Sequence, residues 1–165
     1  MLGIDPGTRF VGYGLVQVEE GNCRAVDYGF FRFDNKLLFP ERLKQIHEAV
    51  SDLMDRSRPD AVAVEEVYVS RNAKTTLRLG QAKGVILLAA VERRIPVAEY
   101  APREVKQAVL GRGGASKDQV QWMMAQMLNL RREGLQEDAA DGLAVALCHA
   151  LRSSGQGSQI LKLEE

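Results

Sequence analysis

Four carboxylates in three well-separated stretches of the sequence are the residues best suited to chemistry. They are Asp5 in GIDPGT, Glu65 in AVAVEEV, and Asp138 with Asp141 in DAADGLAVA. Each lies in or beside apolar sequence, where an ionised carboxylate is costly unless a cation or a hydrogen-bond donor compensates its charge. Carboxylate oxygens are hard ligands that suit Mg²⁺ or Mn²⁺. The pattern therefore indicates a divalent-metal site for metal-assisted phosphate chemistry.

Such a site can hold two ions about 3.5 to 4 Å apart, which generate the attacking hydroxide and stabilise the leaving oxygen of an in-line displacement. We expect Asp5 to bridge both ions, Glu65 to hold one, and Asp138 and Asp141 to hold the other. Mg²⁺ is the expected metal, with Mn²⁺ as a substitute. Without cations, four clustered negative charges would raise one another's pKa. Metal should therefore stabilise the fold as well as activate the site.

The composition fits one domain in a reducing cytoplasm. The chain has 165 residues, of which 45% are hydrophobic and 27% are charged, enough for one full core and too few for two large lobes. We predict a single domain over residues 1–152 and a flexible tail over residues 153–165. Cys23 and Cys148 lack metal-ligand spacing, which argues against a zinc site and a disulfide framework. Because no apolar run is long enough for a membrane span, we expect a cytoplasmic protein without a membrane partner.

Charge is balanced over the whole chain but not along it. Residues 1–70 hold 8 basic and 12 acidic residues, residues 71–117 hold 10 and 3, and residues 118–165 hold 4 and 7. The basic middle segment could follow a phosphate backbone, and the same charges could equally serve to solvate helix surfaces. The candidate DNA contacts in and beside this segment are Tyr68, Arg71, Asn72, Lys74, Arg78, Lys83, Arg103, Lys106, Arg112 and Lys117.

The order of predicted elements indicates an α/β fold. Apolar alternation and short β-branched runs predict strands over residues 1–5, 10–18, 23–33, 61–67 and 96–100. Apolar residues at helical spacing predict helices over residues 40–56, 72–94, 102–110, 116–130 and 136–152. Three closely connected strands followed by crossover connections predict a five-stranded mixed sheet, with three antiparallel strands, then two parallel ones, and helices on both faces.

This sheet would bring the four acids to one place. The first and fourth strands should be parallel neighbours, so that their carboxyl ends place Asp5 near Glu65. Asp138 and Asp141 are three residues apart and therefore share one face near the start of the last helix. If that helix docks its N-terminus at the same sheet edge, all four acids surround one cavity.

The helix predicted over residues 72–94 is apolar nearly all round from Val85 onward, which indicates deeper cover than a surface helix has. Gly80 and Gly84 lie on one of its faces, where small residues let another backbone come close. The neighbour could be a partner subunit or the chain's own sheet, and the sequence leaves both open.

Other conspicuous side chains have structural interpretations. We expect Trp122, Met123, Met124 and Met127 to fill the core rather than to bind a ligand. His47 and His149 lie in no motif and are also expected to be structural.

Four blocks of sequence together resemble the RuvC family of Holliday-junction resolvases. They are GIDPGTRFVGYGLV, AVEEVYVSRNAKTTLRLGQAKGV, APREVKQAVLGRGGASKDQVQ and DAADGLAVALCHA, and they follow the family's order over Met1 to about Leu151. GIDPG alone is a weak signal, because related openings occur in sugar kinases and in other members of the ribonuclease H superfamily. Four blocks in register make the resemblance highly specific.

The resemblance implies a ribonuclease H-like fold, a homodimer, and a magnesium-dependent endonuclease that places paired nicks in a four-way DNA junction. Asp5, Glu65, Asp138 and Asp141 match the family's catalytic acids. Tyr68 matches an aromatic residue that contacts bases at the junction centre. Lys106 and Lys117 match basic residues associated with the scissile phosphate and the DNA backbone. Glu66 departs from the uncharged polar residue that other members often carry. The family also implies a junction-binding protein and a branch-migration motor as partners.

Two rival functions remain to be weighed. The GIDPGT opening also fits an ATP-dependent sugar kinase or an actin-like ATPase, but those proteins need two lobes around the nucleotide and this chain is long enough for one. A junction-binding module that has lost catalysis would bind branched DNA through the basic segment without cutting it. The presence of all four acids argues against that module.

Overall fold

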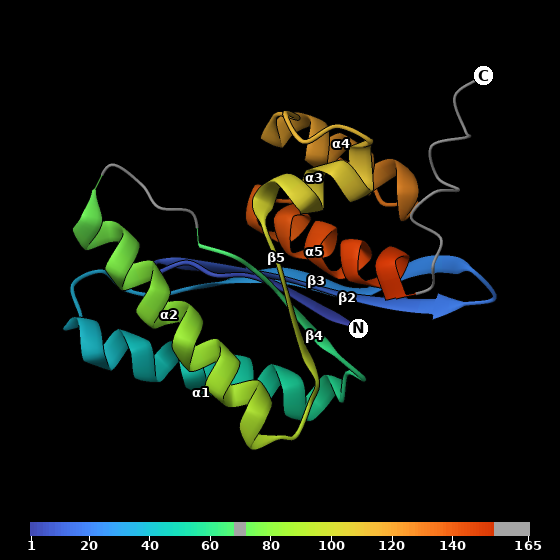
Figure 1. Cartoon of the computed structure of the whole chain (residues 1–165). Coiled ribbons are helices and arrows are strands. Elements are labelled where there is room, and N and C mark those ends of the chain that lie inside the picture. Colours follow the sequence, from blue (N-terminus) through green and yellow to red (C-terminus); the bar gives the residue numbers. More distant parts are fainter. Residues whose placement is uncertain (68–71, 154–165) are drawn as a thin grey trace.

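The computed structural model describes residues 1–67 and 72–153 (Figure 1). The predicted DNA contacts Tyr68 and Arg71 lie outside the described residues, as does all of the predicted tail after Ser153. Ser153 is the last residue of the final helix.

The sheet has five strands in the order β3-β2-β1-β4-β5. The strands β1, β2 and β3 form an antiparallel meander, and β4 and β5 run parallel to β1, as the sequence predicts. The prediction of a mixed sheet with three antiparallel strands followed by two parallel ones is confirmed. The strand bounds are Leu2–Asp5 for β1, Phe10–Glu19 for β2, Asn22–Arg32 for β3, Val62–Glu65 for β4 and Val97–Tyr100 for β5.

Helices cover both faces of the sheet (Figure 1). One face carries α1 and α2, and the other carries α3, α4 and α5, with α5 against the strands. The helix bounds are Phe39–Ser57 for α1, Ala73–Glu92 for α2, Pro102–Leu110 for α3, Lys117–Met127 for α4 and Glu137–Ser153 for α5. No described helix is both long and apolar enough to cross a bilayer.

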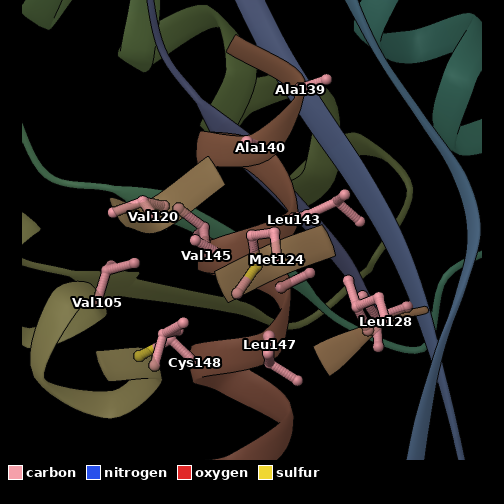
Figure 2. Close-up of a cluster of buried hydrophobic side chains, with 14 of the residues drawn as sticks. Val105, Val120, Met124, Leu128, Ala139, Ala140, Leu143, Val145, Leu147 and Cys148 are labelled. Carbon is pink, nitrogen blue, oxygen red and sulfur yellow. The ribbon is translucent and has the colours of Figure 1, made fainter. Parts of the chain in front are cut away.

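Two hydrophobic cores lie on opposite sides of the sheet. The core under α1 and α2 includes Ile4, Val64 and Ile86. The second core gathers side chains of α3, α4 and α5, and Figure 2 shows Val105, Met124 and Leu143 among them. Because side chains alternate along a strand, neighbouring strand residues feed opposite cores, and both faces of the central strands are buried.

Two expectations differ from the structure. The fourth strand ends at Glu65 rather than at residue 67, although the Glu66 amide still donates to the carbonyl of Tyr100. Trp122 was expected in the core, but 47% of it is exposed. Met124 on the same helix is fully buried. Since α4 lies outside α5 and packs through one face only, a large side chain on its other face remains in solvent.

An apolar face of α2 lies open. Leu77, Leu88 and Val91 are 69%, 50% and 64% exposed, and added Cβ atoms at Gly80 and Gly84 would meet nothing within 4 Å among the described residues. These five residues recur at spacings of three and four, and therefore form one stripe along the helix. We call this stripe the open face of α2. The glycines therefore do not pack on the chain's own sheet, which removes one of the two alternatives that the sequence left open.

Candidate active site

Parallel pairing places Asp5 beside Glu65 at the carboxyl ends of β1 and β4. Ile4 lies opposite Val64 in the register, so the next residue of each strand brings the two acids together. Their side chains share a hydrogen bond, which requires a proton on one of the two carboxyl groups. The expected proximity of these residues is confirmed. In Figure 1 this end of β1 lies away from the labelled N-terminus, toward the side where α1 and α2 begin.

The start of α5 docks against the sheet beside Asp5, because a glycine removes the side chain between them. Gly12 of β2 lies opposite Asp5, and a Cβ atom there would lie 1.9 Å from the carbonyl oxygen of Asp138. Asp141 follows one turn later in the same helix. The contact at Gly12 therefore brings the acidic first turns of α5 to the edge that carries Asp5 and Glu65. We call this edge, with its four acids, the acidic edge.

Burial and mutual repulsion favour the neutral forms of these acids. Burial, followed by the charges of Glu65 and Asp141, raises the pKa of Asp5 well above its ordinary value. Burial and then the Asp141 charge raise the pKa of Glu65, against the opposing charges of Lys106 and Lys117. Burial also raises the pKa of Asp141, although Lys117 opposes it. The three carboxyl groups form one electrostatically coupled cluster, whose repulsion a bound cation would relieve.

Both predicted lysines lie close to these acids. Nζ of Lys117 lies 3.2 Å from Oδ2 of Asp141 and 2.6 Å from Oε1 of Glu137. Burial works against the Lys117 cation, but hydrogen bonds and charges from Glu137 and Asp141 raise its pKa above the ordinary value. Lys117 is therefore a cation at neutral pH. Lys106 of α3 acts on the same cluster, since its charge opposes the rise of the Glu65 pKa.

The chemistry of the donor set fits a divalent cation, although the side chains are not arranged around one. Within residues 1–67 and 72–153, no three or more His, Cys, Asp or Glu side chains are positioned together to hold a metal ion. The pairings explain the difference, because Asp5 and Glu65 bond to each other and Asp141 pairs with Lys117. The carboxyl groups of Asp5, Glu65 and Asp141 are partly buried and repel one another, and carboxylate oxygens are ligands that Mg²⁺ prefers. Binding of a metal here would require these side chains to reorient.

The predicted DNA contacts on α2 have mixed surroundings. Asn72 caps the helix, and its side chain accepts a hydrogen bond of 3.2 Å from the Thr75 amide. Lys74 is exposed in the first turn. The guanidinium of Arg78 lies 5.0 Å from the centre of the Phe39 ring. Lys83 is the least available, because it forms an ion pair with Glu99.

Beyond α2, Arg103 and Arg112 are both exposed. Arg103 lies in the first turn of α3, whose C-terminus is followed by the Gly-rich loop that contains Arg112. They extend the basic surface around Lys106.

The structural roles of the histidines are visible in their contacts. Nε2 of His47 lies 3.0 Å from Oε2 of Glu92, and Nδ1 of His149 lies 2.8 Å from the Tyr100 hydroxyl. Neither contact involves one of the four acids.

Sequence reasoning missed the glycines that let α5 approach the sheet. Gly3 and Gly14 lie opposite each other in β1 and β2, and Cβ atoms there would lie 2.2 Å from the Ala146 amide nitrogen and 2.5 Å from Cα of Leu143. The signal was present, because Gly12 and Gly14 are two residues apart and therefore share one face of a strand. Glu137, a partner of Lys117, was also missed.

Comparisons with known proteins identify the family of this chain. The family model described as crossover junction endodeoxyribonuclease RuvC matches residues 1–149. The protein of that name from Syntrophomonas wolfei is 49% identical over 149 residues, which cover 90% of this chain and 87% of the relative. Thermus thermophilus RuvC, solved in complex with a Holliday junction substrate, is 36% identical with a TM-score of 0.86, and the match covers 94% of this chain and 95% of that one.

A more distant neighbour shows the same fold alone. The yeast mitochondrial Holliday junction resolvase Ydc2 has a TM-score of 0.66 at 16% identity, over 94% of this chain and 79% of that one. The sheet topology, the helices on both faces and these neighbours confirm the ribonuclease H-like fold. The chain belongs to the RuvC family of crossover junction endodeoxyribonucleases.

Proposed function

We propose that this endonuclease resolves four-way DNA junctions by paired symmetric nicks, with Asp5, Glu65, Asp138 and Asp141 as its catalytic acids. The observation that carries the residue assignment is the coupling of Asp5, Glu65 and Asp141 at the carboxyl ends of two parallel strands. Asp138 lies one turn before Asp141, and its charge adds to the rise of the Asp141 pKa. Carboxyl groups held against mutual repulsion are typical of functional sites.

Nucleases of this family are metal-dependent. The four acids would hold two Mg²⁺ ions, with Mn²⁺ as a substitute, and Asp5 is the candidate for contact with both because the charges of Glu65 and Asp141 both act on it. When bound, the ions would supply Lewis-acid activation of water and neutralise charge on the leaving oxygen. The products would carry 5′-phosphate and 3′-hydroxyl ends.

The two lysines would act on the phosphate through their charge. Lys117 is held as a cation by Glu137 and Asp141, and Lys106 lies near Glu65. A cation fixed beside the scissile phosphate stabilises the negative charge that develops during displacement. Glu137 would position Lys117, because it bonds to the ammonium without belonging to the four acids.

The remaining DNA contacts would follow the basic segment away from the acids. We retain Asn72, Lys74, Arg78, Arg103 and Arg112 as contacts to the junction, together with Tyr68 and Arg71 by resemblance. Lys83 would contribute only if DNA displaces Glu99. Base contacts would come from Tyr68, since phosphate contacts carry no direct sequence information.

A homodimer through α2 would present two active sites to the two equivalent strands of a junction. The open face of α2 supports this arrangement, because Leu88 and Val91 are exposed and Gly80 and Gly84 leave room for a second backbone. An isologous interface uses the same patch on both subunits. The paired faces would bury the apolar stripe that the monomer leaves in solvent.

The wider setting rests on the family alone. We propose a cytoplasmic protein that works with a junction-binding protein and a branch-migration motor.

The test incubates an end-labelled synthetic four-way junction with the protein in Mg²⁺, Mn²⁺ or EDTA and maps the products. We expect symmetric, ligatable nicks in either metal, and none in EDTA. Asp5→Asn and Glu65→Gln should each lower cleavage by at least about 10²-fold while retaining junction binding. Asp60→Asn removes an exposed carboxylate that precedes β4, at the opposite end of that strand from Glu65, and is the control.

Other outcomes identify the rivals. Tight junction binding without cutting in either metal would support an inactive binding module and contradict the proposal. Saturable ATP binding or ATP hydrolysis without junction cleavage would support the kinase-like alternative.

A further inference from the structure

A basic groove lies at the edge of the sheet where β2 begins and β3 ends. It has a volume of about 400 Å³ and is lined by Arg9, Arg32, Phe33, Asp34, Asn35 and Lys36. Strand pairing explains the gathering, because Phe10 lies opposite Arg32 and the Phe33 amide donates to the Arg9 carbonyl at 2.8 Å. Three cations from two distant stretches of sequence thus line one groove, which we call the β2–β3 groove.

The three cations of the groove are available to an anion. Arg9, Arg32 and Lys36 are exposed, and none takes part in an ion pair within the part of the chain that the structure describes. The one carboxylate in the lining, Asp34, accepts a hydrogen bond of 2.9 Å from the Lys36 amide. Three positive charges therefore face one negative charge that is already engaged in a turn.

A buried arginine fixes the shape of the groove. Only 8% of Arg42 is exposed, and its guanidinium donates to the carbonyls of Thr8, Asn35 and Leu37 at 3.3 Å each. It thereby ties the connection before β2 to the connection after β3. Its terminal nitrogens bond to carbonyls rather than to a carboxylate, and its buried Nε has no hydrogen-bond partner among the described residues. Its charge therefore adds to the positive potential near the groove.

The groove lies at the same end of the sheet as the acidic edge. Gly12 is opposite Asp5, and Phe10 is two residues closer to that end of β2. With neighbouring strands about 4.8 Å apart and residues about 3.4 Å apart along a strand, Arg32, two strands across and two residues along, lies about 12 Å from Asp5. At about 3.4 Å per nucleotide of one strand, this separation corresponds to roughly three to four nucleotides.

We infer that the β2–β3 groove is a second DNA site, which binds backbone phosphates of a duplex arm a few nucleotides from the cut. The inference rests on the proposed function, and it extends the DNA surface into the acidic first 70 residues. The ligand is the backbone rather than the bases, because Phe33, the only aromatic side chain in the lining, is 6% exposed and offers no stacking surface. The contact is therefore independent of sequence.

The test measures binding of a labelled four-way junction in EDTA at several salt concentrations. The variant Arg9→Gln/Arg32→Gln/Lys36→Gln removes the three cations. The control Arg24→Gln/Arg56→Gln/Arg58→Gln removes three exposed arginines, one at the far end of β3 and two at the far end of α1. Each lost phosphate contact lowers the slope of log K against log salt by about 0.9. For the groove variant we expect the magnitude of this slope to fall by about two to three, at about 0.9 per lost contact. The control should retain the wild-type slope.

A conservative variant separates charge from structure. Arg9→Lys/Arg32→Lys keeps every charge and should restore the wild-type slope. If the triple variant does not fold, Arg32→Gln is compared with Arg24→Gln on the same strand. The slope of log K against log salt should fall by about one for Arg32→Gln and stay unchanged for Arg24→Gln.

Cleavage by the wild-type protein distinguishes failure of the groove as a DNA site from failure of the proposed function. If the wild type cuts junctions in Mg²⁺ and the groove variant has the same salt slope as the control, the groove is not a DNA site and the proposed function stands. If the wild type neither binds nor cuts a junction, both are overturned.

Discussion

Helices α5 and α2 are both apolar and both contain glycine, yet they use these residues in opposite ways. In α5, Gly142 touches the sheet, since a Cβ there would lie 2.5 Å from the backbone of Tyr13, and eleven of its seventeen residues are buried. In α2, added Cβ atoms at Gly80 and Gly84 would meet no other described residue within 4 Å, and Leu88 is half exposed. The first helix is packed within the monomer, and the second leaves its small residues exposed.

The difference shows what a glycine pattern can establish. A small residue indicates that a backbone comes close, but it does not say which backbone. In α5 the partner is the strand beside Asp5, so the contact positions the acidic edge. In α2 the partner would be a second subunit, so the contact would position one active site relative to another.

The largest expected effect comes from adding one methyl group to each helix. Gly142→Ala should lower the free energy of unfolding by about 3 kcal/mol, because the Tyr13 backbone that its Cβ would meet cannot move aside as a flexible side chain can. Gly84→Ala should not destabilise the monomer, since its Cβ enters open space and alanine favours a helix by about 1 kcal/mol. Urea denaturation of both variants, at a protein concentration where sedimentation shows monomer, measures the difference. Equal losses in the two variants would remove the contrast between the helices.

The next effect concerns the open face of α2. Leu88→Glu places a charge in the centre of the proposed interface, and should weaken dimerisation by at least about 10²-fold because a buried unpaired charge is costly. Val26→Glu is a matched control, since Val26 of β3 is also 50% exposed. Sedimentation velocity over a concentration series should give a dimer for the wild type and the control, and a monomer for Leu88→Glu. A monomeric wild type, or a dimeric Leu88→Glu variant, would contradict the interface.

The smallest effect is a pH dependence at the acidic edge that α5 completes. Burial and then the Glu65 and Asp141 charges raise the pKa of Asp5 in the folded state, so between the unfolded and folded pKa values the folded protein holds a proton that the unfolded chain has lost. Without metal, stability from this group is present below about pH 4 and is lost as pH rises through the folded pKa.

Thermal unfolding in EDTA across this range measures the effect. The wild type should lose stability relative to Asp5→Asn as pH rises, and added Mg²⁺ should restore it in the wild type alone. Parallel pH profiles for the two proteins would show that ionisation of Asp5 does not destabilise the folded protein.

Much of the fold and of the acidic edge follows from the sequence, because signals between residues that are close in sequence define the helices and strands. Periodicity, proline and glycine predict most ends of the helices and strands to within one to three residues of their observed positions. Parallel pairing of two short apolar strands is then enough to put Asp5 beside Glu65. The prediction that Trp122 is buried was wrong because periodicity does not reveal which face of an outer helix is covered.

The rest depended on contacts that a linear pattern does not contain. The pairing of Lys117 with Glu137 and Asp141 joins α4 to α5, and the β2–β3 groove joins Arg9 to Arg32 through a strand register. Its cations were hidden in a segment whose overall charge is acidic. Spatial charge, rather than charge per segment, decides where a phosphate can bind.

The most direct measurement is a crystal structure grown with Mn²⁺, with anomalous scattering used to locate the metal. The account predicts anomalous peaks bounded by Asp5, Glu65, Asp138 and Asp141, with the Asp5–Glu65 hydrogen bond broken and oxygens about 2.0 to 2.3 Å from the metal. Asp5→Asn crystals should lose those peaks. Ordered Mn²⁺ elsewhere on the protein, with none between these four carboxylates, would contradict the account.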